Sequence, residues 1–315
     1  MVLKPAPESP LSALHLARAL RDAGLPDGVL ELVTGPGDEV ARRLVAADGY
    51  DALTFTGSTE VGAEIRRALA DRNVPLQTEM GGKNAAVVLA DANLDLVLDA
   101  LVAGAFVQAG QRCTATSRVL VERPRYDELV SRLAARAGDI RVGPGLDEES
   151  RMGPLVTERR LEAVLDALGR ARADGAELAA GGERIGEEPL GHGWFLQPTL
   201  LAGVGSTNEA WRTELFAPVV ALAPVDSLDR AIELVNGSRY GLSASIFTRD
   251  LEAATRFGSA VDAGCVAVNL PTAGWDVHMP FGGFKDSGSA FKEQGAESFG
   301  FYTRVKTIAT RAEGL

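Results

Sequence analysis

The sequence predicts an α/β protein built around a parallel sheet. Short apolar runs of strand length, such as 52–57 and 85–90, alternate with longer segments whose apolar residues recur at helical spacing. Strands that alternate with helices form right-handed βαβ units, which build parallel sheets. Because 315 residues exceed the size at which one core stops growing, we expect two domains.

The first third of the chain follows this alternation after a proline-stiffened start. Apolar residues recur at helical spacing from Leu11 to Leu20, with Ser9 as the expected N-cap and Gly24 as the stop. The pattern then predicts a strand at 29–35, a helix at 38–47, a strand at 52–57 and a helix at 58–70.

The alternation continues to the end of the chain. We expect strands at 85–90, 117–122, 243–247 and 263–269, helices at 93–108, 125–137, 158–173 and 228–235, a surface loop at 142–155, and an edge strand at 303–310.

Composition excludes several classes of function. A net charge of −11 argues against a nucleic-acid partner and against anionic membranes, because both need a positive face. No apolar run reaches the roughly 18 residues of a membrane span. Two cysteines cannot form a disulfide framework, which favours the cytoplasm. The histidines, His15, His192 and His278, are scattered, so no metal site is expected.

The stretch 106–118, FVQAGQRCTATSR, carries a thiol at the end of an apolar helical run. The neighbouring guanidinium of Arg112 and three hydroxyl residues would favour the thiolate, which is the nucleophilic form. Cys113 is therefore a candidate nucleophile. The alternative from this stretch alone is a small buried side chain. Cys265 lies in a strand-like apolar run and is interpreted as packing.

A candidate general base lies upstream in the stretch 74–84, VPLQTEMGGKN. Glu79 stands between a strand-like run and a Gly-Gly turn, which would place its carboxylate at the carboxyl end of a strand, the usual location of ligand sites in α/β sheets. The 34 positions between Glu79 and Cys113 leave room for a strand and a crossover helix.

Four ordered motifs then resemble the aldehyde dehydrogenase superfamily: TEMGGKN, GQRCTATSR, ELFAPVV (214–220) and PFGGFKDSG (280–288), within a resemblance that runs from Leu3 to Arg311. The resemblance implies a partial Rossmann-like dinucleotide-binding half at 1–79 and an α/β catalytic domain at 80–285. It further implies a return segment to the cofactor domain at 286–302 and an oligomerisation strand at 303–315.

The resemblance implies oxidation of an aldehyde to a carboxylic acid with NAD or NADP. Cys113 would form a thiohemiacetal and then a thioester, which water activated by Glu79 would hydrolyse. Implied cofactor-binding residues are Lys4, Thr56, Gly57, Ser58, Glu214 and Phe216; Glu293 is a possible proton relay, and Arg112 and Phe281 belong to the substrate pocket. Packing or surface roles remain open for Glu214, Phe216, Glu293 and Phe281, and the turn at 57–62 alone would be an ordinary strand-to-helix turn.

The motif pattern looks most like bacterial semialdehyde oxidisers of the α-ketoglutarate semialdehyde type. A distal substrate carboxylate could then be received by Arg112 or His278, although Arg112 could equally tune the thiol or face solvent. Family members that select NAD often carry a glutamate three residues after the lysine matching Lys4. Because that place is Pro7 here, with Glu8 next, we expect weak discrimination between NAD and NADP.

The family pattern includes a further N-terminal portion, with an asparagine amide that helps to hold the oxyanion, and nothing before Lys4 matches it. An alternative hypothesis is therefore a catalytically impaired chain or pseudoenzyme that acts as a structural subunit. A third hypothesis, a relative that transfers the acyl group to coenzyme A, is opposed by Glu79, because such enzymes usually lack this base. The implied C-terminal strand predicts a homo-oligomer, a dimer or tetramer, that is weakened or dependent on a companion chain.

Overall fold

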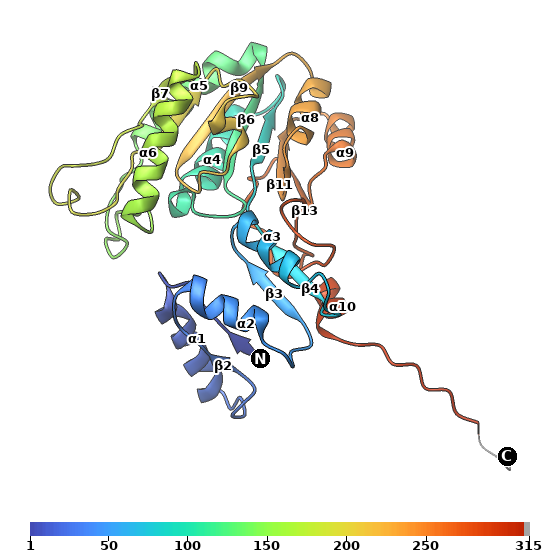
Figure 1. The fold of residues 1–315 in the computed structure, drawn as a ribbon. Helices are drawn as coiled ribbons and strands as arrows, with labels where there is room; N and C mark the ends of the chain where they lie inside the picture. The colour runs from blue at the N-terminus through green and yellow to red at the C-terminus, as the bar shows by residue number, and fades with distance from the viewer. Residues whose placement is uncertain (312–315) are drawn as a thin grey trace. The chain divides into compact units, whose positions relative to one another are not determined.

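The computed structural model describes residues 1–311, which divide into two compact units. The first unit contains residues 1–54 and 60–76, and the second contains 55–59 and the described chain from Gln77 onward. The expected boundary between 79 and 80 lies three residues from this division (79 − 76). Figure 1 shows the order of the elements along the chain.

The first part of the chain is made of short elements. Two-residue strands β1 and β2 pair in parallel, so the strand expected at 29–35 shrinks to the two residues that find a partner. Ser9 stands at the N-cap of α1 without a side-chain cap bond, and no residue of α1 is buried. The elements are β1 (Val2–Leu3), α1 (Pro10–Asp22), β2 (Glu31–Leu32), a π turn (Gly37–Ala41), α2 (Arg42–Ala46), β3 (Leu53–Thr56), α3 (Thr59–Ala68) and β4 (Leu76–Glu79).

The second unit is organised around a seven-stranded sheet of order β12-β11-β5-β6-β9-β8-β7. All neighbouring pairs are parallel except β7 with β8. The confirmed fold class is therefore α/β with a mainly parallel sheet. Its strands are β5 (Asn84–Val88), β6 (Thr116–Glu122), β7 (Glu177–Ala180), β8 (Thr199–Ala202), β9 (Val219–Val225), β11 (Ser243–Phe247) and β12 (Cys265–Val268); β10 (Tyr240–Gly241) and β13 (Phe284–Lys285) form a separate antiparallel pair.

The central strands are buried on both faces. Every residue of β5 and of β11 is buried, which explains why these runs are continuously apolar or small rather than alternating. Helices supply the cover: α4 (Leu94–Ala105), α5 (Arg123–Gly138), α6 (Glu158–Ala173), α7 (Glu209–Arg212), α8 (Leu228–Asn236) and α9 (Leu251–Ala260). Helices α8 and α9 pack together, and α9 lies against β11 and β12 (Figure 1).

Side-chain caps fix where these helices begin. The side chains of Asn93, Thr157, Ser227 and Asp250 accept hydrogen bonds from the first turns of α4, α6, α8 and α9. Such caps satisfy backbone N–H groups that have no partner within the helix. Within α5 the buried residues Leu129, Leu133 and Ala137 repeat every four positions, so one stripe of the helix meets the core.

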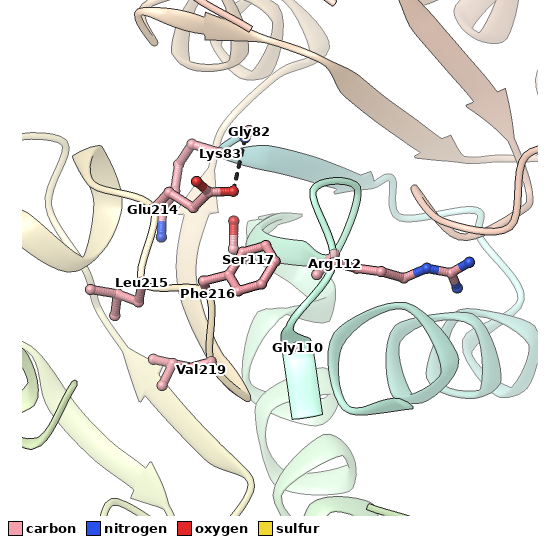
Figure 2. A pocket seen from close by; sticks show the side chains of 11 residues that line it. Gly82, Lys83, Gly110, Arg112, Ser117, Glu214, Leu215, Phe216 and Val219 are labelled. Atoms are coloured by element: carbon pink, nitrogen blue, oxygen red, sulfur yellow. Dashed lines mark hydrogen bonds between the residues drawn. The ribbon is translucent and has the colours of Figure 1, made fainter. Parts of the chain in front are cut away.

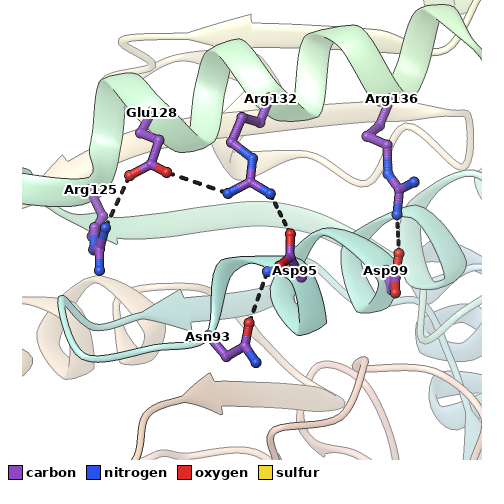
Figure 3. Close-up of polar contacts among 7 residues, drawn as sticks. All are labelled: Asn93, Asp95, Asp99, Arg125, Glu128, Arg132 and Arg136. Atoms are coloured by element: carbon purple, nitrogen blue, oxygen red, sulfur yellow. Dashed lines mark hydrogen bonds and ion pairs between the residues drawn. The ribbon is translucent and has the colours of Figure 1, made fainter.

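A row of ion pairs joins α5 to α4 (Figure 3). Arg132 and Arg136 of α5 pair with Asp95 and Asp99 of α4, and Glu128 pairs with Arg132 within α5. These side chains are exposed, so each pair contributes at most about 1 kcal/mol. Together they hold the helix whose carboxyl end leads to the thiol.

The chain ends in a short helical turn and an exposed segment. After a 3-10 turn (Ala296–Ser298) and α10 (Phe299–Tyr302), residues 303–311 form no β pairing within the described chain. Val305 and Ile308 are 98% and 79% exposed. The expected edge strand at 303–310 therefore does not form within residues 1–311, and residues 312–315 of the implied oligomerisation strand lie outside the described chain.

Candidate active site

The loop that carries Cys113, residues 111–115, is called the thiol loop here and lies at the amino-terminal edge of the large sheet. Strands β5, β6, β9, β11 and β12 begin at Asn84, Thr116, Val219, Ser243 and Cys265. Cys113 stands three residues before β6 begins, after a tight turn in which Gln108, Ala109 and Gly110 have φ of 60°, 54° and 63°. Left-handed backbone is unfavourable for non-glycine residues, so this turn must be held by its surroundings. At Gly110 a Cβ would lie 2.2 Å from the carbonyl oxygen of Ala217.

Asn84 fastens the thiol loop to the sheet. Its Nδ2 donates to the carbonyl oxygens of Cys113 at 2.8 Å and Ala115 at 2.9 Å. Its Oδ1 accepts from the backbone N–H of Ser243 at 3.1 Å. The side chain is only 2% exposed and all these groups are paired, so it joins three segments and leaves little freedom to the backbone at Cys113.

A second anchor comes from Thr272. Its hydroxyl donates to the carbonyl oxygen of Thr114 at 2.7 Å and lies 2.7 Å from the hydroxyl of Thr116. The Thr272 carbonyl oxygen in turn accepts from Ser243 Oγ at 2.7 Å and from Trp275 Nε1 at 2.8 Å. Asn84 and Thr272 thus hold the backbone from Cys113 to Thr116.

Several groups act on the pKa of the Cys113 thiol, and Arg112 is not the largest of them. Burial, followed by the negative charge of Glu214, raises the pKa of Cys113 to about 11. The charge of Arg112 lowers this pKa but is the smallest of the influences. The guanidinium of Arg112 points away from Glu214 (Figure 2). Arg112 therefore acts on this pKa in the direction expected from the sequence, but desolvation and the charge of Glu214 outweigh it.

Glu79 is the last residue of β4, as expected for a carboxylate at the end of a strand. Glu79 is 3% exposed. Burial, followed by the charge of Glu293, raises its pKa to about 8. The charge of Lys292 and hydrogen bonds from the Gly283 N–H and the Gln77 side chain lower this pKa. The charge of Glu79 also raises the pKa of Cys113, so the two groups lie within electrostatic reach. A carboxyl group that titrates near neutrality suits a general base.

An apolar cluster lies beside the thiol. Leu242, Cys265 and Phe281 form it, and Cys113 and Trp275 pack against it. Phe281 therefore belongs to the apolar cluster against which the thiol packs. Cys265 is buried, and burial is also the largest cause that raises its pKa.

A pocket lies on another side of the loop (Figure 2). Glu214 accepts a hydrogen bond at Oε1 from the backbone N–H of Gly82 at 3.0 Å. A Cβ on Gly81 would lie 1.9 Å from Glu214 Oε2, so the carboxylate rests directly on the Gly-Gly turn. The lining residues are Gly82, Lys83, Gly110, Arg112, Ala115, Ser117, Glu214, Leu215, Phe216, Ala217 and Val219.

Glu214 and Phe216 are the residues of this pocket that could hold the ribose end of a nicotinamide nucleotide. A carboxylate fixed at one oxygen can accept hydrogen bonds from sugar hydroxyls, and Phe216 offers an aromatic face beside it. Phe216 has φ of 53°, which shows that the surrounding chain holds it in an unfavourable backbone conformation.

The other predicted cofactor residues fall in two places. Gly57 donates its N–H to the carbonyl oxygen of Glu79 at 3.1 Å, so the turn Thr56–Ser58 lies next to the base. Lys4 belongs to the first unit, where its Nζ bonds the carbonyl oxygen of Pro5 at 2.7 Å.

The two remaining charged candidates differ in burial. Burial raises the pKa of Glu293, and its charge acts on Glu79, so the two carboxyl groups lie close together. His278 is exposed and pairs with Asp276 at 3.0 Å. Its predicted role in binding a carboxylate gains no support from this arrangement.

Sequence analysis missed Lys83, Asn84, Thr272 and Lys292. A signal existed for Asn84, because a polar amide in a buried apolar run must find partners. Lys83 is 2% exposed, and burial lowers its pKa to about 7. Thr272 and Lys292 gave no signal, because their partners lie far away in sequence.

Neither a metal centre nor a membrane span emerges from the described part of the chain. Among residues 1–311, no group of three or more histidine, cysteine, aspartate or glutamate side chains is placed to hold a metal ion. None of the helices described in this range combines the length and the apolar character that crossing a bilayer requires.

Comparisons with known proteins agree with the resemblance found in the sequence. Residues 1–308 match the model of the aldehyde dehydrogenase family. The chain is 40% identical over 308 residues to the alpha-ketoglutaric semialdehyde dehydrogenase of Bacillus subtilis (strain 168), covering 98% of this chain and 63% of the relative. It is 43% identical over 309 residues to the alpha-ketoglutarate semialdehyde dehydrogenase of Haloferax volcanii, covering 98% and 64%.

The chain is also similar to solved structures of aldehyde dehydrogenases. The betaine aldehyde dehydrogenase of Staphylococcus aureus in complex with NAD+ matches with a TM-score of 0.92 at 31% identity, covering 96% of this chain and 59% of that one. A mutant of an aldehyde dehydrogenase from Bacillus cereus matches with a TM-score of 0.93 at 36% identity, covering 98% and 61%. The chain thus spans less than two thirds of the length of these proteins. It belongs to the aldehyde dehydrogenase family.

Proposed function

We propose that this chain carries the catalytic thiol and base of an NAD(P)-dependent oxidation of an aldehyde to a carboxylic acid. The observation that carries the proposal is the placement of Cys113 and Glu79 in one buried neighbourhood, where the charge of one acts on the pKa of the other. The family and its semialdehyde dehydrogenase members support the same reaction class.

In the proposed reaction, the Cys113 thiol gives up its proton to solvent, and the thiolate sulfur attacks the aldehyde carbon, which becomes tetrahedral and leaves the negative charge on its oxygen. A nicotinamide held beside Cys113 would supply the hydride acceptor; collapse of the oxyanion with loss of hydride would leave a thioester on Cys113. Glu79 then removes a proton from water, which attacks the thioester and releases the acid. A pKa of about 8 lets Glu79 take this proton and return it to solvent near neutral pH.

Glu214 and Phe216 are proposed to hold the nicotinamide ribose and ring, because their pocket offers the fixed carboxylate and the aromatic face. Thr56, Gly57 and Ser58 are proposed to approach the cofactor from the turn beside Glu79. Lys4 as a contact of the adenosine ribose remains a prediction. Weak discrimination between NAD+ and NADP+ remains one too, and a preference above about a hundredfold, roughly 2.7 kcal/mol, would contradict it.

The proposed substrate is an aldehyde with a distal carboxylate. Relatives named as semialdehyde dehydrogenases support this class, and Arg112 is the cation beside the thiol that could receive the carboxylate. Similar efficiency for a plain alkyl aldehyde and its ω-carboxy analogue would oppose it.

The test is NAD(P)H production with a panel of aldehydes, for the wild-type chain alone and with a supplied N-terminal portion of a relative. Cys113→Ala should abolish dehydrogenase and esterase activity, whereas Glu79→Gln should still form the acyl-enzyme but release it slowly. Cys265→Ala is the matched thiol control and should keep the chemistry. If substrate shields Cys265 and not Cys113 from iodoacetamide, the assignment of the nucleophile is wrong.

A second candidate is a catalytically impaired chain that acts as a structural subunit. The observation that favours it is the pKa of about 11 for Cys113, which leaves little thiolate at neutral pH in this state. Cofactor binding without turnover for any aldehyde, alone or complemented, would select this candidate.

A further inference from the structure

Lys292 lies where three segments of the site meet. Its Nζ donates to the carbonyl oxygen of Gly282 at 2.6 Å and lies 3.4 Å from that of Gly264. Gly264 directly precedes Cys265, and Gly282 directly follows Phe281, so the ammonium group joins the strand and the loop that form the apolar cluster beside the thiol. The ammonium also stands 5.1 Å from the centre of the Phe284 ring.

Glycines bring this lysine close to the base. A Cβ on Gly282 would lie 2.6 Å from Glu79 Oε1 and 3.2 Å from Lys292 Cδ. A Cβ on Gly264 would lie 2.9 Å from Lys292 Nζ. Glu79 and Lys292 therefore approach the same glycine, which has no side chain of its own to keep them apart.

The loop that carries Lys292 is fixed to the strand that carries Glu79. The backbone N–H of Met80 donates to Ser287 O at 2.8 Å, and that of Ser289 donates to Thr78 O at 3.1 Å. Further along, the N–H of Glu293 donates to Phe281 O at 2.7 Å. These bonds fix the position of the ammonium relative to the carboxyl group.

We propose that Lys292 is a positioning residue for Glu79, which holds the loop around the base and supplies the positive charge that keeps this buried carboxyl group able to ionise. Glu293, the next residue, acts with the opposite sign. The consecutive pair Lys292-Glu293 thus sets the pH range in which Glu79 can accept a proton.

The other titratable groups near Glu79 are few. The charge of Glu79 raises the pKa of both Cys113 and Cys265, and burial is the largest cause that raises the pKa of each thiol. Gly283 N–H and the Gln77 side chain favour the ionised form, and neither of them titrates. Removal of the Lys292 charge should therefore raise the pKa of Glu79.

The inference rests on the proposed role of Glu79 in thioester hydrolysis. The test uses Lys292→Gln, which keeps a hydrogen-bond donor for the two carbonyl oxygens and removes the charge, and Lys292→Arg, which keeps the charge. Lys285→Met is the matched control, because Lys285 also bonds main-chain carbonyls, those of Asn236 and Ser238, but does not act on Glu79.

Hydrolysis of the Cys113 acyl-enzyme formed from 4-nitrophenyl acetate should be roughly tenfold slower at pH 7 in Lys292→Gln, corresponding to a shift of about one pH unit, and should reach the wild-type rate at high pH. Lys292→Arg and Lys285→Met should keep the wild-type profile. A loss that is equal at all pH values, or an unchanged profile in Lys292→Gln, would overturn the proposal.

A direct titration separates this inference from the proposed function. The carboxyl band of Glu79 can be followed by infrared difference spectroscopy against pH and assigned with Glu79→Gln. It should move to higher pH in Lys292→Gln even if the chain turns over no substrate. An inactive wild type with this shift would defeat the proposed function alone, whereas an unmoved band would defeat the role of Lys292.

Discussion

The backbone N–H of Gly82 donates to Oε1 of Glu214 at 3.0 Å and joins residues 132 positions apart in the sequence. The second carboxylate oxygen rests over Gly81, where a Cβ would come within 1.9 Å. The Gly-Gly turn after the base therefore also sets the position of the carboxylate in the proposed ribose pocket, so one motif serves two sites.

Gly81→Ala should displace Glu214 and weaken binding of NAD(P)+ while the fold persists. The added methyl group and the carboxylate cannot occupy the same space, and the side chain that moves also loses its bond to Gly82. We expect a loss of about tenfold or more in affinity, the scale of one lost hydrogen bond to a charged group, measured by calorimetry. Gly169→Ala is the control: it adds the same methyl group on the exposed side of α6, with nothing within 4 Å, and should not change binding.

Glu214→Gln should make Cys113 more reactive toward iodoacetamide. The charge of Glu214 raises the pKa of the thiol, and glutamine removes that charge while it can still accept from Gly82. The alkylation rate should rise across the range below pH 11, measured in a Cys265→Ala background that leaves one thiol. Arg112→Met should change the rate in the opposite direction, because Arg112 lowers the pKa. A slower reaction in Glu214→Gln would refute this electrostatic picture.

Stability should fall as the pH rises through the titration of Glu79. The folded protein keeps a proton on Glu79 up to about pH 8, whereas the unfolded chain releases it near 4.5. Between these two pH values the folded state binds more protons than the unfolded chain. The free energy of unfolding therefore falls as the pH rises, by roughly a few kcal/mol over the whole range.

Glu79→Gln should therefore gain stability relative to wild type as pH increases from about 4.5 to about 8, and stay level above it. The measurement is the difference between the two unfolding curves, because Lys83, whose pKa is lowered to about 7, titrates in both proteins. Glu162→Gln changes an exposed carboxylate on α6 and should match wild type throughout. A constant difference between Glu79→Gln and wild type would contradict the buried titration.

Deletion of residues 303–315 should reduce self-association. The described part of this segment is exposed and forms no strand among residues 1–311, and an exposed terminal segment can add as a strand to the sheet of a second copy. Sedimentation at micromolar concentration should show a dimer or tetramer for the full chain and a smaller species for the deletion. A monomer in both cases would remove the proposed role of this segment.

The sequence by itself determined the fold class and predicted Cys113 and Glu79 as the two principal residues of the proposed site. Short runs of apolar or small residues at β5 and β11 predict strands. This signal is local, so it can be recognised without any knowledge of tertiary contacts. Cys113 and Glu79 stood out for the same reason, because each is a reactive side chain within a few residues of glycine in a short local motif.

Tertiary structure decided the chemical state of these groups. Arg112 is adjacent to Cys113 in sequence, yet burial and Glu214, 101 positions away (214 − 113), outweigh it and raise the pKa of the thiol. Likewise, Lys292 and Glu293 act on Glu79 from more than two hundred positions away (292 − 79 = 213). Desolvation and charge depend on distance in space, which the order of residues does not contain.

The edge of the sheet that holds the site was also settled only by the fold. The rule for open parallel sheets places ligands at the carboxyl ends of strands, and Glu79 obeys it on β4. The thiol loop and its anchors instead gather where β5, β6 and β11 begin. The local sequence pattern defines each strand, but the pairing register of the sheet is what brings Asn84, Thr116 and Ser243 together. That register arises from packing between segments that are distant in the sequence, so the sequence pattern of one strand does not contain it.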